Sequence, residues 1–443
     1  MSDLPRSAVT RAAKLATLPL GFAGRTALGL GKRVGGKPAE VVAAEVQART
    51  AAQLFAVLGE LKGGAMKFGQ AMSIFESALP EELAAPYRAM LTKLQDSAPP
   101  LPARVVHEVL AAEVGPRWRR SFREFSDEPV AAASIGQVHR GTWKDGRDVA
   151  VKIQYPGAGP ALLSDISQIS RVARVATVWI PGIEIKPILE ELRNRMSEEL
   201  DYRLEAKSQE AFARGFDGDP HFLIPHVVKG TEHVIVSEWV GGEALSKVID
   251  KGSRAKRDAA AQRYMEFLLA GPGRVGILHA DPHPGNFKLL PDGRLGVLDF
   301  GAVNRLPRGL PHEMGAFLTL AVRGDAPGTL QGLRDTGFVR PSMQIDADRL
   351  LEYLEPFIAP LRTDTFTFSR PWLREVFGHI NDPRRPNYTV GMKLNLPPEY
   401  LLIHRVWLGG IGVLCQINGQ VRGRETVAAL MPGAQLPPVG QSA

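Results

Sequence analysis

The sequence predicts an α+β fold, in which a strand-rich lobe is followed by a helical lobe, and three patterns predict it. β-Branched and turn residues dominate from about residue 122 to residue 154, and a further strand pattern covers residues 234–240. Apolar residues recur at helical spacing in residues 39–95, 159–178 and 186–215. After residue 241 the helical spacing prevails again, apart from one hairpin. Such runs of strands and of helices are typical of the α+β class.

Proline and glycine clusters divide the chain into five segments. Pro99, Pro100 and Pro102 end the first helical region, and Gly241 with Gly242 closes the last long strand pattern. We expect, in order, a flexible basic N-terminus, a helical extension, a small strand-rich lobe with a long helix, a helical large lobe and a disordered tail, at residues 1–38, 39–100, 101–240, 241–430 and 431–443.

The composition is that of an ordinary soluble globular protein, with 443 residues, 44% hydrophobic and 23% charged. The one cysteine, Cys415, excludes an intramolecular disulfide and fits a reducing compartment, so we expect a cytoplasmic protein. The net charge of +7 is too diffuse to indicate nucleic-acid binding, and no nucleic-acid partner is expected.

No segment reaches the roughly 18 to 20 uncharged apolar residues that a membrane-spanning helix requires. Residues 15–30 are interrupted by Pro19 and Arg25, and residues 401–417 contain His404 and Arg405, so the latter run predicts a buried helix. The first 38 residues carry seven Lys or Arg against one Asp but no uninterrupted apolar core, so a secretory signal is not expected. This basic arm is either solvated or in peripheral contact with an anionic membrane.

Two short motifs carry the chemistry of the chain. Asp281 stands five residues before Asn286, and Asp299 begins an Asp-Phe-Gly sequence at the end of an apolar strand. Phosphoryl transfer from Mg·ATP needs an Asp to orient the attacking group, and an Asn and an Asp to hold metal. We therefore predict that Asp281 orients an acceptor hydroxyl or water, and that Asn286 and Asp299 bind Mg²⁺.

A predicted hairpin brings the two metal ligands together. Residues 287–290 and 295–298 read as strands joined by an Asp-Gly turn, so Asn286 and Asp299 meet although they lie 13 residues apart. His279 and His283 suggest an alternative zinc site, but the cysteine is remote and no third histidine stands at ligand spacing. A structural role for both histidines is favoured.

A third candidate, Lys152, ends the second of two strands predicted at residues 137–143 and 148–153. A lysine at this place clamps the nucleotide phosphates in protein kinases. Residues 237–240 follow a later strand and are predicted to form the hinge that meets adenine, with Glu238 and Val240 as candidates. This order of parts predicts a protein-kinase-like two-lobe fold with an N-terminal helical extension and with ATP and Mg²⁺ as cofactors.

The turn that should cover the phosphates is rich in alanine instead of glycine: it contains Ala131, Ala132, Ala133 and Ser134. This substitution resembles the UbiB/AarF-type family of atypical kinases, whose members include proteins that support ubiquinone biosynthesis. The resemblance extends from about residue 40 to residue 305. It also rests on three further stretches, Lys67-Phe68-Gly69-Gln70, Glu199-Leu200-Asp201 and the connection at residues 93–100.

The resemblance implies roles for residues that the spacing alone leaves unassigned. Lys67 and Gln70 would lie over the nucleotide cleft, with Glu199 and Asp201 as polar partners. Glu205 would be the helix carboxylate that pairs with Lys152. Alanine resists the positive φ angles that glycine permits, so the phosphate cradle should be stiff and nucleotide preference altered. The resemblance also implies a role in isoprenoid quinone or other lipid metabolism, with lipid or quinone-pathway partners, near membranes.

Several alternatives remain open at this stage. Residues 279–286 also resemble small-molecule phosphotransferases of the aminoglycoside and choline kinase type, and Ala280 replaces the usual arginine of protein kinases. A non-catalytic module that keeps ATP as a structural ligand is a second alternative, and a nucleotide-independent helical scaffold is a third. The acceptor of the phosphoryl group is not written in the sequence.

Overall fold

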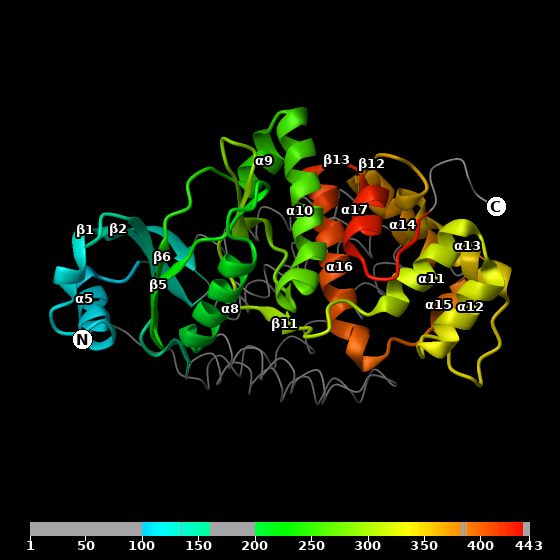
Figure 1. Cartoon of the computed structure of the whole chain (residues 1–443), viewed down its shortest axis with the longest axis horizontal. Helices are drawn as coiled ribbons and strands as arrows, with labels where there is room; N and C mark the ends of the chain where they lie inside the picture. The colour runs from blue at the N-terminus through cyan, green and yellow to red at the C-terminus, as the bar shows by residue number, and fades with distance from the viewer. Residues whose placement is uncertain (1–99, 134, 160–199, 382–384, 386–387, 437–443) are drawn as a thin grey trace, which may run out of the picture. The chain divides into compact units, whose positions relative to one another are not determined.

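The computed structural model describes residues 100–133, 135–159, 200–381, 385 and 388–436 (Figure 1). The predicted helices before residue 99 lie outside these residues, as do the candidates Lys67, Gln70, Ser134 and Glu199. The described chain forms two compact units, which comprise residues 100–203 with 229–236, and residues 204–228 with 237–436.

The first unit is built on a five-stranded sheet with the strand order β1-β2-β3-β6-β5. Its elements are α5 (Ala103–Glu113), β1 (Phe122–Ala133), β2 (Gly136–Trp143), β3 (Asp148–Gln154), β5 (Val227–Gly230) and β6 (Val234–Glu238), of which β5 and β6 each have two residues in the second unit. In β3 the alternate residues Val149, Val151 and Ile153 are fully buried, which is the period of two that a half-buried strand requires. The predicted strands around the 144–147 turn are confirmed, whereas β6 ends at Glu238, two residues earlier than expected.

The second unit is mainly helical and carries short strand pairs. Its helices are α8 (Tyr202–Gly215), which begins in the first unit, α9 (Leu245–Lys251), α10 (Arg254–Val275), α11 (His312–Arg323), α12 (Ala326–Asp335), α13 (Ala347–Ile358), α14 (Arg370–Asn381), α15 (Tyr388–Lys393), α16 (Pro398–Ile417) and α17 (Gly423–Leu430). Its strands are β4 (Phe222–Leu223), β7 (Glu243–Ala244), β8 (Ile277–His279), β9 (Phe287–Leu289), β10 (Leu295–Val297), β11 (Val303–Arg305), β12 (Phe366–Thr367) and β13 (Gln420–Val421).

An aromatic cluster forms the core of the second unit beside α10. Its rings lie 5.0 to 6.0 Å apart, centroid to centroid, in the pairs Phe212–Phe300, Phe216–Phe222 and Phe267–Phe287. Burial of each such ring contributes roughly 1.5 to 3 kcal/mol. The cluster explains why residues 204–228 belong to the helical unit, although the sequence predicted one lobe from 101 to 240.

Helix α16 lies beside α10 in the second unit (Figure 1). It confirms the helix predicted at residues 401–417, and it is the one described helix that is long and apolar enough to cross a membrane. Only 56% of its apolar window is buried, because Leu401 and Leu408 lie on an exposed stripe with His404 and Arg405. A mostly buried core helix passes the same test of length and hydropathy, so α16 is weak evidence for a membrane span.

The start of the predicted disordered tail is packed against the second unit. Met431 is 4% exposed, and the backbone N–H of Gln435 donates to Oγ1 of Thr319 at 2.9 Å. The expectation of disorder from residue 431 is therefore wrong for residues 431–436, because apolar burial and hydrogen bonds hold them. Residues 437–443 lie outside the described part.

Candidate active site

A short strand pair joins the two motif loops of the second unit. Strand β8 ends at His279 and pairs antiparallel with β11, so that His279 lies opposite Val303. The pairing continues where Ala280 N donates to Ala302 O at 2.9 Å. Asp281 therefore follows the last paired residue of one strand, and the Asp299-Phe300-Gly301 segment precedes the first paired residue of the other, so both lie at the same end of the strand pair.

Asn286 links the two loops through its backbone and its side chain. Its amide nitrogen Nδ2 donates to the carbonyl oxygen of Asp281 at 3.2 Å, and its own carbonyl accepts from Leu298 N at 2.9 Å. Asn286 is 9% exposed and ends a 3₁₀ turn that His283 caps by accepting from Gly285 N at 3.1 Å. The Nδ2 group is a hydrogen-bond donor and does not bind cations, so the amide oxygen is the atom that Asn286 can present to a cation.

Asp299 is fixed from both sides. Its Oδ1 accepts from Gly301 N at 3.0 Å, and its carbonyl oxygen accepts from Nε2 of His279 at 2.6 Å. The predicted hairpin between Asn286 and Asp299 is confirmed: β9 and β10 pair antiparallel, and Gly293 turns the chain with φ of +85°. The structure thus brings together Asp281, Asn286 and Asp299, as the sequence predicted.

These residues fit Mg²⁺ better than zinc. An amide oxygen and a carboxylate are hard oxygen donors, and Mg²⁺ is usually held by one or two carboxylates together with waters and substrate phosphates. Within the described ranges no group of three or more His, Cys, Asp or Glu side chains is placed to hold a metal, and His279 and His283 are engaged by the loop backbone. The hydrogen bonds of the two histidines fit the structural role predicted for them, which stays a prediction.

Tyr264, a residue of α10, is hydrogen-bonded to the loop that carries Asp281. The ring is fully buried in α10, and its hydroxyl donates to the carbonyl oxygen of Pro282 at 2.7 Å. Burial, and secondarily the negative charge of Asp281, raise the pKa of Tyr264 well above its usual value. The hydroxyl stays protonated and remains a donor to the loop.

Lys152 belongs to the first unit, where it is half-buried on β3. Its ammonium nitrogen lies 5.1 Å from the ring centroid of Tyr202, the first residue of α8. Glu205, its predicted partner, lies one turn further along α8 and is 5% exposed. A buried carboxylate requires a cation or hydrogen-bond donors, which suits the predicted role, and the pairing of Lys152 with Glu205 stays a prediction.

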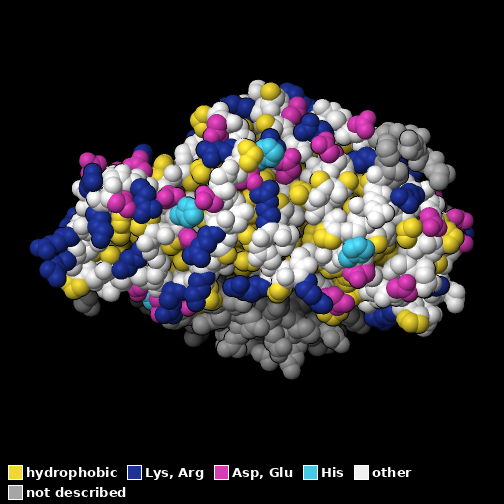
Figure 2. Space-filling view, in the orientation of Figure 1, with side chains coloured by type: hydrophobic (Ala, Val, Ile, Leu, Met, Phe, Trp, Pro, Cys, Tyr) yellow, Lys and Arg dark blue, Asp and Glu magenta, His cyan; other side chains and the backbone are white. Residues whose placement is uncertain are grey.

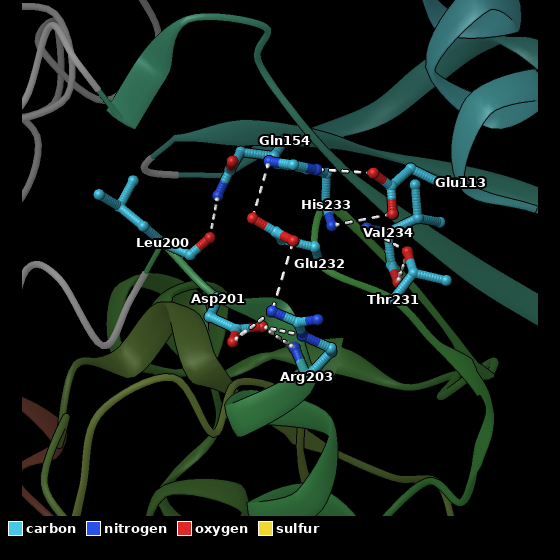
Figure 3. A network of polar contacts seen from close by, with 9 residues as sticks. All are labelled: Glu113, Gln154, Leu200, Asp201, Arg203, Thr231, Glu232, His233 and Val234. Atoms are coloured by element: carbon cyan, nitrogen blue, oxygen red, sulfur yellow. Dashed lines mark hydrogen bonds and ion pairs between the residues drawn. The ribbon is translucent and has the colours of Figure 1, made fainter.

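Asp201 is held in a polar network at the start of α8 (Figure 3). The Asp201 carboxylate accepts from Nε of Arg203 at 2.8 Å and from Nη2 at 3.0 Å, and Arg203 also pairs with Glu232 at 3.3 Å. The preceding carbonyl, of Leu200, accepts from Nε2 of Gln154 at 3.1 Å. Gln154 ends the strand of Lys152, so Leu200, the residue before Asp201, is hydrogen-bonded directly to that strand.

A second part of the network anchors the turn that precedes β6. Nδ1 of His233 lies 2.7 Å from Oε1 of Glu113, on α5, and Gln154 N donates to His233 O at 2.9 Å (Figure 3). Burial raises the pKa of Glu113, but the hydrogen bonds from His233 and Thr231 outweigh it and hold that pKa below its usual range. Glu113 therefore stays ionised and braces the turn.

The alanine-rich turn is more regular than the sequence predicted. Ala131, Ala132 and Ala133 continue β1 and pair with Val138, Gln137 and Gly136. Strand pairing leaves only residues 134 and 135 between the two strands. The backbone beside the predicted phosphate site is thus the end of a paired hairpin, and the stiffness of the cradle stays a prediction.

The predicted hinge is contacted by a cation from another strand, Lys288 of β9, which the sequence did not predict. Nζ of Lys288 donates to the carbonyl oxygen of Val240 at 2.8 Å and lies 4.9 Å from the ring centroid of Trp239. Glu238, also in this segment, accepts from His226 N through Oε2 at 3.2 Å. The signal for Lys288 was a charged residue between two buried residues of β9, two positions after Asn286.

Buried polar residues of β2 were also missed. Oε1 of Gln137 accepts from Leu101 N at 2.8 Å, and Nε2 of Gln137 lies 2.7 Å from Nε2 of His139. Nδ1 of His139 is 2.8 Å from Ser126 O, and burial lowers the pKa of His139. These bonds attach the chain entering the small lobe to the sheet, at a place where the sequence showed only a Gln-Val-His alternation.

Two cavities of the second unit lie away from these residues. One, of about 330 Å³, is lined by Ala259, Gln262, Arg263, Thr365, Gln420, Val421 and Arg422. The other, of about 390 Å³, is lined by Gln344, Ile345, Asp346, Arg349, Thr389, Val390 and Lys393. Neither lining includes Asp281, Asn286 or Asp299, so neither cavity belongs to the candidate site.

Known proteins resemble this chain over most of its length. Among curated relatives, atypical kinase COQ8B, mitochondrial, of Danio rerio is 28% identical over 76% of this chain and 54% of its own length. Atypical kinase COQ8, mitochondrial, of Saccharomyces cerevisiae is 28% identical over 81% and 72%. This chain spans about half the length of the first curated relatives that it matches.

This chain also resembles a solved structure and matches a family model. The structure of the Rv3197–erythromycin complex from Mycobacterium tuberculosis is 40% identical, with a TM-score of 0.71, over 90% of this chain and 100% of that one. The model of the ABC1 atypical kinase-like domain matches residues 93–332, more than half of the chain. The resemblance seen in the sequence motifs and the predicted kinase-like α+β fold are thereby confirmed, and the protein belongs to the ABC1 atypical kinase-like family.

Proposed function

We propose that this protein binds Mg·ATP and acts as an atypical kinase or ATPase. The observation that carries the proposal is the pair of bonds made by Asn286, to the carbonyl of Asp281 and from the amide of Leu298. These bonds hold the candidate acceptor-orienting carboxylate and the two candidate metal ligands in one loop system, as phosphoryl transfer requires. Membership of the kinase-like family supports the same reading.

Each candidate residue has a distinct role in this proposal. Asp281 orients an acceptor hydroxyl or a water, while Asn286 and Asp299 hold Mg²⁺, which neutralises phosphate charge when it is bound. Lys152 contacts the phosphates, because a compact ammonium with three donors can hold several phosphate oxygens. Glu205 positions Lys152.

The nucleotide contacts are proposed around these residues. The backbone of Glu238 and Val240 meets the base, and the amides of residues 131–134 meet phosphate. Lys67, Gln70, Glu199 and Asp201 line the cleft near the nucleotide. Of these, Asp201 is described; its carboxylate pairs with Arg203, and the neighbouring carbonyl of Leu200 accepts from Gln154 on the strand of Lys152, which supports this part of the proposal.

We propose a role in isoprenoid quinone or other lipid metabolism, in the cytoplasm and in peripheral contact with membrane. The names of the curated relatives support the atypical-kinase part of this reading. A basic surface supports the membrane part: Arg117, Arg119 and Arg120 are exposed beside α5, where Figure 2 shows basic side chains gathered. Each basic residue near an anionic surface contributes about 1 kcal/mol.

Release of ADP from ATP tests the reaction. The wild type should release ADP in the presence of Mg²⁺, and Asp281→Asn should lose that release while it keeps nucleotide binding. Asp292→Asn is the matched control, since Asp292 lies in the exposed hairpin turn and pairs with Arg294. Release with water alone, or stimulated by anionic vesicles, favours an ATPase. Equal release by wild type and Asp281→Asn would contradict the proposed role.

A second candidate function is phosphorylation of a hydroxylated small molecule. The observation in its favour is the erythromycin complex of the 40% identical protein. The candidate predicts ADP release that depends on a macrolide acceptor, with a product heavier by one phosphate. Binding of the macrolide without any product would instead leave a ligand-binding role.

A further inference from the structure

Tyr202 presents its ring face to the candidate phosphate-binding lysine. Nζ of Lys152 lies 5.1 Å from the ring centroid, within the roughly 6 Å range of cation–π attraction. Tyr202 is 1% exposed, whereas Lys152 is half-buried. The pair is thus partly desolvated, and the attraction between a cation and a ring is stronger there than at a fully exposed site.

The ring of Tyr202 is held in place by the backbone around it. Tyr202 N donates to Glu232 O at 3.0 Å. Two residues earlier, Leu200 O accepts a hydrogen bond from Nε2 of Gln154. A Cβ atom at position 136 would lie 3.0 Å from the Tyr202 hydroxyl oxygen and 2.2 Å from Ile153 O. Glycine at 136 therefore leaves the space that the ring and β3 occupy.

We propose that Tyr202 is a positioning residue that holds the ammonium of Lys152 ready for the nucleotide phosphates. The proposal rests on the proposed function of Lys152 as a phosphate ligand. A lysine side chain has many rotamers, so a free lysine loses conformational entropy when it meets phosphate. A ring that already restricts the ammonium removes part of this loss, which is preorganisation.

Two substitutions separate the ring from the rest of the side chain. Tyr202→Phe keeps the ring face and should hold affinity for Mg·ATP within about twofold of wild type. Tyr202→Leu keeps an apolar side chain but removes the ring, and should weaken Mg·ATP binding roughly tenfold, which corresponds to about 1.4 kcal/mol.

A double-mutant cycle distinguishes positioning from general loosening of the fold. In a Lys152→Met background, Tyr202→Leu should produce no further loss of affinity, because the group through which Tyr202 acts is missing. A structural role alone would lower affinity by the same factor in both backgrounds, and that result would overturn the proposal.

A spectroscopic signature tests the contact without any nucleotide. Protons that lie over an aromatic face shift upfield, so the ε-protons of Lys152 should be upfield-shifted in wild type and in Tyr202→Phe, but not in Tyr202→Leu. Lys288, over Trp239 at 4.9 Å, is the matched control and should be unchanged in all three proteins. The resonance is assigned by its disappearance in Lys152→Met.

The chemical shift of Lys152 and the affinity for Mg·ATP test the positioning role and the proposed function separately. Absence of the upfield shift at Lys152 in the wild type would overturn the proposal even if Tyr202→Leu does not fold. Presence of the shift with no binding of Mg·ATP would overturn the proposed function and with it the positioning role, while it leaves the contact itself established.

Discussion

The imidazole Nε2 of His279 lies 2.6 Å from the carbonyl oxygen of Asp299, twenty residues further along the chain. A carbonyl can only accept, so Nε2 carries the proton. His279 is 1% exposed and its ring packs on Phe212, Phe287 and Phe300. The strand that leads to Asp281 is thus bonded directly to the candidate metal ligand.

Replacement of His279 should loosen Asp299. His279→Phe keeps an aromatic ring but removes the donor to a buried carbonyl, which should cost about 1 to 3 kcal/mol of the free energy of unfolding. Affinity for Mg²⁺ in the presence of ATP should fall as well. Urea unfolding and metal titration measure the two effects. His283→Asn, on the same loop, should have the smaller effect on stability; if both variants match wild type, the bond has no structural weight.

Lys288 should matter for the base of the nucleotide and not for its phosphates. Burial lowers the pKa of Lys288. Its ammonium donates to Val240 O and lies over the Trp239 ring. Lys288→Met keeps the aliphatic stem and should weaken ATP binding about 2- to 12-fold, as loss of a hydrogen bond of about 0.5 to 1.5 kcal/mol predicts. Inorganic tripolyphosphate with Mg²⁺ should bind equally to both proteins. An equal loss for both ligands would argue against residues 237–240 as the hinge.

Protonation of Glu113 should lower the free energy of unfolding in acid. Hydrogen bonds from His233 and Thr231 overcome the effect of burial and hold the pKa of Glu113 below the ordinary 4.5. A carboxyl with a depressed pKa contributes stability that is complete above its unfolded pKa and is lost as the pH falls through its folded pKa. Glu113→Gln should therefore lower stability near neutral pH and flatten its decline below about pH 4.5.

Urea unfolding at a series of pH values measures this fall in the free energy of unfolding. The control is Glu108→Gln on the same helix, where the ion pair with Arg104 is exposed and should contribute less than about 1 kcal/mol. If the free energy of unfolding falls equally steeply with acid in wild type and in Glu113→Gln, the Glu113–His233 pair is not the cause of the fall.

Gly136 should be intolerant of even one methyl group. In Gly136→Ala the new Cβ would meet Ile153 O and the Tyr202 hydroxyl, and overpacking of this kind costs about 1 to 3 kcal/mol. Gly273, in α10, faces open space, and Gly273→Ala should stabilise the protein by about 0.5 to 1 kcal/mol. Thermal unfolding compares the two. A neutral Gly136→Ala would mean that β2 and α8 adjust freely.

The local parts of the site could be predicted from the sequence. The hairpin between Asn286 and Asp299 has a defined turn signal, with Gly293 at positive φ, and the strands on either side of the 144–147 turn have clear alternation. Both depend on residues close together in the chain, where propensity and turn chemistry decide the structure.

Longer contacts could not be predicted in this way. Strands β8 and β11 have three residues each, which is too short for a pattern, and Glu113 meets His233 across 120 residues. Lys288 looked like an ordinary strand lysine until the fold placed it against Val240. The run of alanines was read as a turn because its pairing with β2 depends on partners beyond it.

Binding of nucleotide through a metal ion is the central property proposed for this protein. Thermal stability of the wild type should rise with Mg·ATP, by about 2.7 kcal/mol at 100 times the Kd, and the rise should require Mg²⁺. Asp299→Asn should lose that rise, while Asp292→Asn in the exposed turn should keep it. No shift at millimolar nucleotide, or an equal shift in Asp299→Asn, would contradict the proposed site.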